Sequence, residues 1–153
     1  MSLAGITAVE HPLNELKNIS RSLLDAGIHG ICFSAYDEGQ QPGDQLTEAQ
    51  VRRKLSILKP HISWVRTFSC TEGNELIAQI AHELGIKTLV GAWLGDDLEK
   101  NEAEIVGLIT LCRQGAVDVA AVGNEVLYRE DLEVNALVNY IERVKAEVSG
   151  VPV

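Results

Sequence analysis

The chain is poor in cysteine, aromatic residues and long hydrophobic runs. Its three cysteines, Cys32, Cys70 and Cys112, are odd in number and widely spaced, and no C-x-x-C pair occurs. This pattern argues against a disulfide framework or a zinc site and favours reduced, mostly buried thiols. No apolar stretch approaches the roughly 18 residues that a membrane-spanning helix needs, so we expect no membrane partner.

Patterns for metals, nucleic acids and secretion are also missing. The four histidines are scattered, and no H-E-x-x-H motif occurs, so we expect no metal site and no cofactor. A formal net charge of −9 and a pI near 4.8 argue against a nucleic-acid or anionic-membrane partner. Residues 1–17 lack the basic start and apolar core of a signal peptide. The localisation therefore stays open, with the cytoplasm as the default expectation.

What the sequence does contain is a regular alternation of two kinds of segment. Short apolar runs at 30–36, 62–70, 87–95 and 117–123 predict strands whose starts lie 25 to 32 residues apart. A run that is apolar throughout indicates a strand buried on both faces, as in a parallel sheet. Helical periodicity separates these runs, so the chain reads as four βα units in an α/β domain.

Local signals set the predicted helix ends. Thr47 and Gln50 form a capping box before one helix, and Asp96 or Asp97 can cap another that runs to about Arg113. A further helix is predicted over roughly 131–148. Before the first strand, residues 12–27 predict an extra helix that stops at Gly27.

Two architectures use repeated βα units, a doubly wound sheet and a TIM barrel. The first predicts a glycine-rich phosphate turn after the first strand, but "YDEGQQPGD" matches neither G-x-G-x-x-G nor a P-loop. A complete barrel has eight units in typically about 250 residues. We therefore predict half of a (β/α)8 TIM barrel over 29–153, preceded by an N-terminal helical segment over 1–28. The final "GVPV" reads as the beginning of a fifth strand.

Polar side chains follow the predicted strands, where a barrel places its active site. They are found at 36–37, 66–69, 93–97 and 124–125. Glu125 stands first among them, because a partly desolvated carboxylate at the barrel mouth can act as a general acid. Asn124 beside it can hold a sugar hydroxyl. Alternatively, Glu125 is simply an acid near the start of the next helix, where the helix dipole stabilises a negative charge.

Three more residues are candidates for substrate binding. Arg66 lies within a strand and should be paired, either with a mouth carboxylate such as Glu125 or in a purely structural ion pair. Trp93 and Tyr36 have flat faces and polar edges suited to stacking on sugars. Core packing is an equal alternative for Trp93.

Four strand-end blocks together resemble the bacterial branch of glycoside hydrolase family 17. They are "GICFSAYDEGQQPGD", "WVRTFSCTEGNE", "GAWLGDDLEKNEAEI" and "AVGNEVLYRED", in chain order from about residue 29 to the end. The resemblance implies a retaining enzyme on a TIM barrel that acts on β-1,3-glucan by hydrolysis or transglycosylation. It also implies that Glu125 is the general acid/base and that Asn124 contacts the sugar 2-hydroxyl. Tyr36, Arg66 and, less closely, Trp93 match substrate-binding positions.

The same resemblance implies that something is missing. Retaining glycosidases need a second carboxylate as nucleophile, and the family supplies it from strand seven, whereas this chain stops at strand five. We therefore expect the parent protein to be a glycoside hydrolase and the isolated chain to be inactive. The alternative is a non-catalytic half-barrel that binds carbohydrate. Its open edges predict a homodimer or association with a missing C-terminal half.

Overall fold

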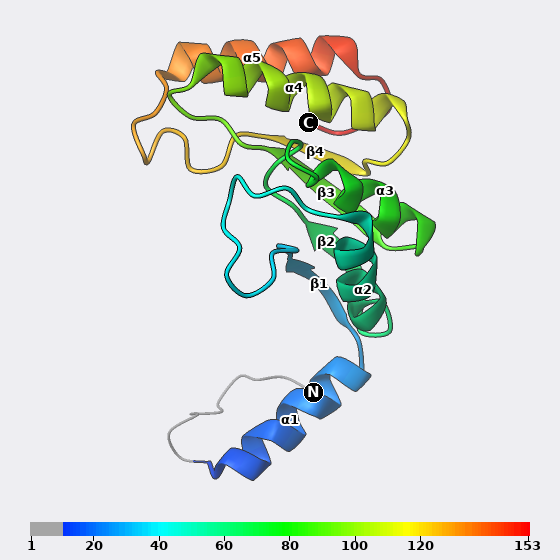
Figure 1. Cartoon of the computed structure of the whole chain (residues 1–153). Coiled ribbons are helices and arrows are strands. Elements are labelled where there is room, and N and C mark those ends of the chain that lie inside the picture. The colour runs from blue at the N-terminus through cyan, green and yellow to red at the C-terminus, as the bar shows by residue number, and fades with distance from the viewer. Residues whose placement is uncertain (1–10) are drawn as a thin grey trace.

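The computed structural model describes residues 11–153 and shows a curved parallel sheet with helices along one face (Figure 1). Each strand is followed by a helix, as the alternation in the sequence predicts. In chain order the elements are α1 (Leu13–Asp25), β1 (Ile28–Cys32), α2 (Glu48–Leu58), β2 (Ile62–Arg66), α3 (Glu75–Glu83), β3 (Lys87–Ala92), α4 (Leu98–Arg113), β4 (Val119–Val122) and α5 (Val134–Glu147).

The strand order identifies a barrel segment. The four strands pair in the order β1-β2-β3-β4, all parallel, with Ile28 opposite Ile62, Val65 opposite Thr88 and Leu89 opposite Val119. In Figure 1 helices α2 to α5 follow one another along the same side of this sheet. A doubly wound sheet would have helices on both faces, so the one-sided cover is that of a TIM barrel.

The core lies between the sheet and these helices. Val65 and Val90 point from the strands toward Leu55 of α2, Ile80 of α3 and Leu108 of α4, and all five are almost fully buried. The helical stripes predicted from the sequence supply the buried faces of α2, α3 and α4. Burying each such side chain stabilises the folded state by about 1.5–3 kcal/mol. This packing fixes the strand ends that carry the site.

The predicted helix caps are confirmed, whereas the predicted strands are too long at their C-terminal ends. Thr47 accepts a hydrogen bond from the Gln50 N–H, and Asp97 accepts from the N–H groups of Glu99 and Lys100. The Gln50 side chain does not complete the predicted capping box, because its amide donates to the Ala35 carbonyl instead. The first strand ends at Cys32 instead of residue 36, and the second ends at Arg66 instead of residue 70. The N–H groups of Phe33 and Thr67 still donate to the Arg66 and Leu89 carbonyls of the neighbouring strands, and the residues after them form the loops around the site.

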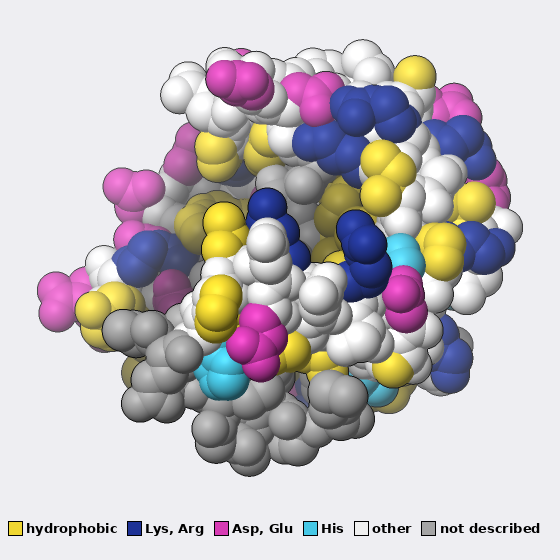
Figure 2. Space-filling view, turned by 90° about the horizontal axis from the view of Figure 1, so that it is seen from below, with side chains coloured by type: hydrophobic (Ala, Val, Ile, Leu, Met, Phe, Trp, Pro, Cys, Tyr) yellow, Lys and Arg dark blue, Asp and Glu magenta, His cyan; other side chains and the backbone are white. Residues whose placement is uncertain are grey.

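The opposite face of the sheet is open. Trp64, Arg66 and Leu89 alternate with the buried Val65 and Val90 and line a shallow groove on this face. Seen from below, the surface is hollowed, with hydrophobic and basic side chains gathered around the hollow (Figure 2). In a closed barrel these side chains would face the interior.

The two ends of the chain differ in how they meet the barrel. None of the residues of α1 is buried, and the helix extends away from the sheet (Figure 1). The prediction for 1–28 also includes residues 1–10, which lie outside the described residues. At the other end the Ala120 N–H donates to the Pro152 carbonyl at 2.8 Å, which places the last residues beside β4.

Between residues 11 and 153, no helix is long and apolar enough to cross a membrane. In the same range no group of His, Cys, Asp or Glu side chains has the arrangement of a metal site.

Candidate active site

The C-terminal ends of the first three strands enclose a pocket of about 270 Å³. The loop after β1 contributes Tyr36, the loop after β2 contributes Phe68, and the end of β3 contributes Trp93. Aromatic side chains with polar groups between them are the usual lining of a small-molecule site. The remaining lining residues are Phe33, Ser34, Pro42, Ser69, Glu72, Asn74 and Lys100.

Tyr36 and Trp93 therefore lie in one pocket, although 57 residues separate them in the sequence. The Tyr36 hydroxyl accepts a hydrogen bond from the amide of the buried Asn74 at 3.2 Å. Trp93 is 37% exposed, so part of its surface is available to a ligand. Its alternative assignment to the core does not fit this exposure. Both rings are placed where a sugar could stack on them.

Arg66 joins the pocket to the end of β4. Its guanidinium donates to Asn124 Oδ1 at 2.7 Å and lies 4.8 Å from the centre of the Phe68 ring. The expected pairing with a mouth carboxylate is not what the structure shows, because the partner of Arg66 is the Asn124 amide rather than Glu125. This bond leaves the Asn124 amide N–H₂ group available as a donor.

The turn after β4 has an unusual backbone. Gly123 has a φ of 81°, and a Cβ on it would lie 2.6 Å from Val126 Cγ2, so no other residue fits without a shift. Glu125 also has a positive φ, 54°. For a residue with a side chain this conformation costs on the order of 1–3 kcal/mol, and such strain concentrates at functional sites.

Glu125 itself is exposed. Within residues 11–153 no hydrogen bond or ion pair holds its carboxylate, so the expected partial desolvation is wrong for this part of the protein. The strand does place Glu125 at the barrel mouth beside Asn124. On the side of the mouth beyond β4 the described residues leave this carboxylate open.

Arg129, which the sequence reasoning missed, fixes this turn. Its guanidinium donates to the backbone carbonyls of Asn124 and Leu94, pairs with Asp131 at 2.7 Å, and lies 4.4 Å from the centre of the Trp93 ring. The end of β3 and the turn after β4 are thereby held together. An arginine four residues after a strand-end acid was the available signal, but sequence spacing alone does not reveal its partners.

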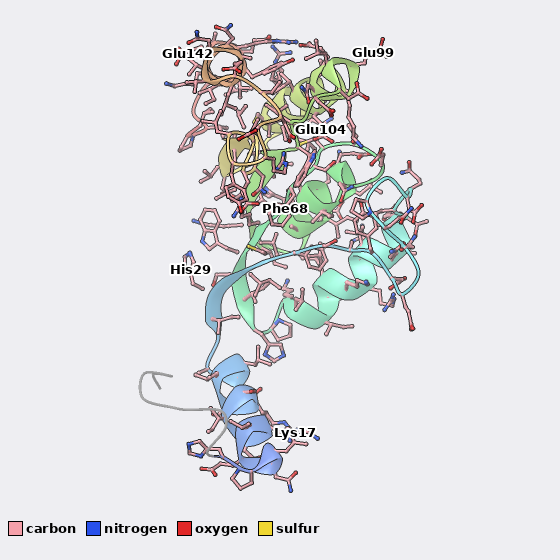
Figure 3. The ribbon with its side chains drawn as sticks, turned by 90° about the vertical axis from the view of Figure 1, so that its left-hand side faces the viewer. Lys17, His29, Phe68, Glu99, Glu104 and Glu142 are labelled. Carbon is pink, nitrogen blue, oxygen red and sulfur yellow. The ribbon has the colours of Figure 1, made fainter. Side chains whose placement is uncertain are left out.

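A second missed residue, Glu104, lies beneath the pocket. It projects from α4 and is fully buried, and it accepts hydrogen bonds from groups in the loops after β2 and β3. Figure 3 labels it on α4, with Phe68 below it at the end of β2. The signal was present in the sequence, because Glu104 falls on the inward stripe of the helix with Ile105 and Leu108.

Two groups next to pocket-lining residues have shifted pKa values. At the surface, hydrogen bonds from Lys54 and Arg53 lower the pKa of Asp37 in the loop after β1. In the interior, burial raises the pKa of the Cys70 thiol well above its ordinary range, and the nearby Glu104 raises it further. Cys70 is therefore an inert, protonated thiol beneath the pocket, which agrees with the expectation of buried thiols.

Comparisons with known proteins agree with this geometry. Residues 30–153 match the family model described as the BtgE/BtgC glycoside hydrolase domain. Two glucan 1,3-beta-glucosidase sequences from Candida albicans are 28% identical over 101 residues, which make up 63% of this chain and 33% of each relative. An active-site mutant of Rhizomucor miehei beta-1,3-glucanosyltransferase, solved in complex with laminaritriose, is 28% identical with a TM-score of 0.64.

The chain corresponds to only part of the proteins that it matches. The structural match covers 80% of this chain but 46% of the glucanosyltransferase, and the chain spans 33% of the curated relatives. Helix α1, at residues 13–25, precedes the family match, which begins at residue 30. The comparisons confirm the TIM-barrel family and the resemblance to β-1,3-glucan glycoside hydrolases of the family 17 type.

Proposed function

Because the chain belongs to the BtgE/BtgC glycoside hydrolase domain family, we propose that it is part of a retaining enzyme that acts on β-1,3-glucan. Glu125 is the general acid/base in this proposal, and the pocket at the ends of β1 to β3 holds the sugar chain. The single observation that carries it is the turn after β4, where a strained backbone presents Asn124 and Glu125 beside an aromatic pocket.

The chemistry assigns a role to each neighbour of Glu125. The acid protonates the departing glycosidic oxygen and then removes a proton from the incoming water or sugar hydroxyl. Asn124, oriented by Arg66 at 2.7 Å, directs its amide N–H₂ toward a sugar hydroxyl. Tyr36 and Trp93 provide stacking surfaces for neighbouring sugar rings.

The nucleophile belongs, in this proposal, to a part of the catalytic domain outside these 153 residues. A retaining pair needs two carboxyl groups about 5–5.5 Å apart. Two other acids, Glu130 and Asp131, lie in the same turn as Glu125; Asp131 is already paired with Arg129, and Glu130 is exposed. The chain also spans less than half of its structural relative, so room remains for a second acid. The 153-residue chain alone should bind glucan without cleaving it.

Replacing Glu125 tests the assignment directly. In the protein with a complete catalytic domain, Glu125→Gln should lower cleavage of laminari-oligosaccharides by roughly 10²–10⁴-fold, because general acid–base catalysis is lost. The release of reducing ends measures this loss. Glu130→Gln is the matched control, since Glu130 is also exposed and also has a positive φ, 60°. Cleavage that survives in Glu125→Gln would remove Glu125 from the acid/base role.

A second candidate function follows from the open inner face of the sheet. If two copies close this face around a two-fold axis, the chain is a non-catalytic carbohydrate-binding homodimer. Light scattering should then give a dimer, and Leu89→Asp on the open face should return it to a monomer. Leu127→Asp is the control, because Leu127 is exposed in the turn after β4. A wild-type monomer excludes this candidate.

A further inference from the structure

Glu104 is the most completely bonded side chain in the described part of the barrel mouth. Its Oε1 accepts hydrogen bonds from Ser69 Oγ at 2.5 Å and Thr71 Oγ1 at 2.6 Å. Its Oε2 accepts from the N–H of Cys70 at 2.7 Å and from the N–H of Trp93 at 3.1 Å. The residue is 0% exposed. A buried carboxylate is costly unless its oxygens are satisfied, and here both of them are.

These four donors belong to two different loops. Ser69, Cys70 and Thr71 follow β2, whereas Trp93 follows β3. Two of the donors, Ser69 and Trp93, belong to residues that line the pocket. One side chain therefore sets the spacing between two walls of the proposed sugar site. It does so from beneath, since it is not itself a lining residue.

Helix α4 is packed closely enough to allow this reach. A Cβ on Gly107, one turn after Glu104, would lie 2.7 Å from the Cys70 carbonyl oxygen. The Cys70 thiol in turn donates to the Gly91 carbonyl at 3.4 Å. The loop after β2 is thus clamped between α4 and β3, and the Glu104 carboxylate is at the centre of the clamp.

We propose that Glu104 is a positioning residue that determines how tightly the pocket holds a β-1,3-linked oligosaccharide. By fixing the backbone at Trp93 and the side chain of Ser69, it keeps the stacking surface and its polar neighbour in the binding geometry before the sugar arrives. This role rests on the proposed function of the pocket. It adds a residue that touches neither the sugar nor Glu125.

Two substitutions of Glu104 separate the loss of its hydrogen bonds from the loss of its charge. In Glu104→Gln the amide oxygen can replace Oε2 and still accept from the two backbone N–H groups. The amide N–H₂ then takes the place of Oε1, and the hydroxyls of Ser69 and Thr71 can rotate to accept from it. In Glu104→Leu all four donors lose this acceptor, and the N–H of the buried Cys70 is left without a partner, which is the costly outcome for hydrogen bonds.

The first measurement follows Trp93 itself and requires no sugar. In a Trp64→Phe background, Trp93 is the one remaining tryptophan. Glu104→Leu should raise its quenching by acrylamide and shift its emission, while Glu104→Gln should resemble the parent. Far-UV circular dichroism shows whether each variant is folded. If Glu104→Leu does not fold, Thr71→Val, which removes one donor outside the pocket lining, should give a smaller change in the same direction.

The second measurement is laminaritriose binding by titration calorimetry. Glu104→Leu should weaken binding by about tenfold, the size expected when hydrogen-bond donors lose a charged acceptor, and Glu104→Gln should stay within about twofold of the parent. Asn101→Ala is the matched control. Asn101 is also buried on α4, but it exchanges its two hydrogen bonds with Gly95, which does not line the pocket.

The outcomes separate the two proposals. Altered Trp93 quenching together with weakened binding in Glu104→Leu, and recovery of both in Glu104→Gln, supports the positioning role. If Asn101→Ala changes both readouts equally, general loop stability is sufficient and the positioning role is overturned. Unchanged quenching in Glu104→Leu also overturns it. If quenching changes as expected but the parent binds no laminaritriose, the positioning of Trp93 holds and the proposed function of the pocket fails.

Discussion

Two neighbouring regions of the barrel mouth are built in opposite ways. At the ends of β1 to β3 the pocket is walled by aromatic side chains and supported from beneath by Glu104, with both carboxylate oxygens bonded. At the end of β4 the backbone is strained at Glu125, and the carboxylate is exposed. The described residues enclose the pocket, whereas they leave the Glu125 carboxylate open on one side.

This difference separates binding from chemistry along the chain. In the proposed function, a pocket made from three consecutive βα units holds a sugar without help from the rest of the barrel. An acid/base, by contrast, needs a partner carboxylate and a surrounding that removes water. In the proposed function, recognition therefore belongs to the first three units and the chemistry to the turn after β4.

The largest effect is expected where the strained turn allows no side chain. Gly123→Ala adds a Cβ 2.6 Å from Val126 Cγ2 at a φ of 81°. Overpacking and a left-handed backbone together should lower the free energy of unfolding by about 2–4 kcal/mol. Urea denaturation measures this loss.

Gly115→Ala is the matched control for Gly123→Ala. Gly115 has a similar φ of 74°, but nothing lies within 4 Å of an added Cβ, so only the backbone cost remains, about 1 kcal/mol. If the two variants lose equal stability, the contact with Val126 does not constrain the turn, and the contrast between the two regions loses its structural basis.

A smaller effect concerns the enclosed side. Burial raises the pKa of Cys70 well above its ordinary range, so above a pH of about 8.5 the unfolded chain loses a proton that the folded chain keeps. This contribution is complete at lower pH and is lost as the pH rises, by up to about 1.4 kcal/mol per pH unit. Cys70→Ala should flatten the decline of stability between about pH 8.5 and 10.

Cys32→Ala serves as the control for that decline, because Cys32 is exposed. Thermal unfolding across this pH range distinguishes the two variants. A slope that is the same in Cys70→Ala and in the wild type would mean that water reaches the thiol, and hence that the space beneath the pocket is less enclosed than the hydrogen bonds of Glu104 indicate.

The sequence predicts the fold well because its signals are local. The N-cap at Thr47, the cap at Asp97 and the helical stripes of α2 and α4 are set by residues within one or two turns, and the structure confirms them. The strand ends are harder to predict. Residues 33–36 and 67–70 are as apolar as the strands before them, and tertiary packing, not propensity, turns them into the loops around the pocket.

The candidate site is predictable in part for the same reason. Strand-end position identifies Tyr36, Trp93, Asn124 and Glu125, because parallel strands bring their C-terminal ends to one edge. The partners of Arg66 and Arg129 depend on how loops pack across that edge, which no local pattern reveals. Glu104 stands out in the sequence as a polar residue on an apolar stripe. Its role can be inferred only from the structure, which shows the two loops that it joins.

The central claim is that the first three βα units form a complete sugar-binding site next to Glu125, and laminaritriose binding by the 153-residue chain tests it most directly. Calorimetry should give saturable binding in the wild type and in Glu125→Gln. Trp93→Ala should weaken it by about tenfold because the stacking surface is lost, whereas Tyr128→Ala, which removes an 87% exposed aromatic outside the pocket lining, should leave it unchanged. Binding that survives in Trp93→Ala, or that is absent from the wild type, would contradict the account.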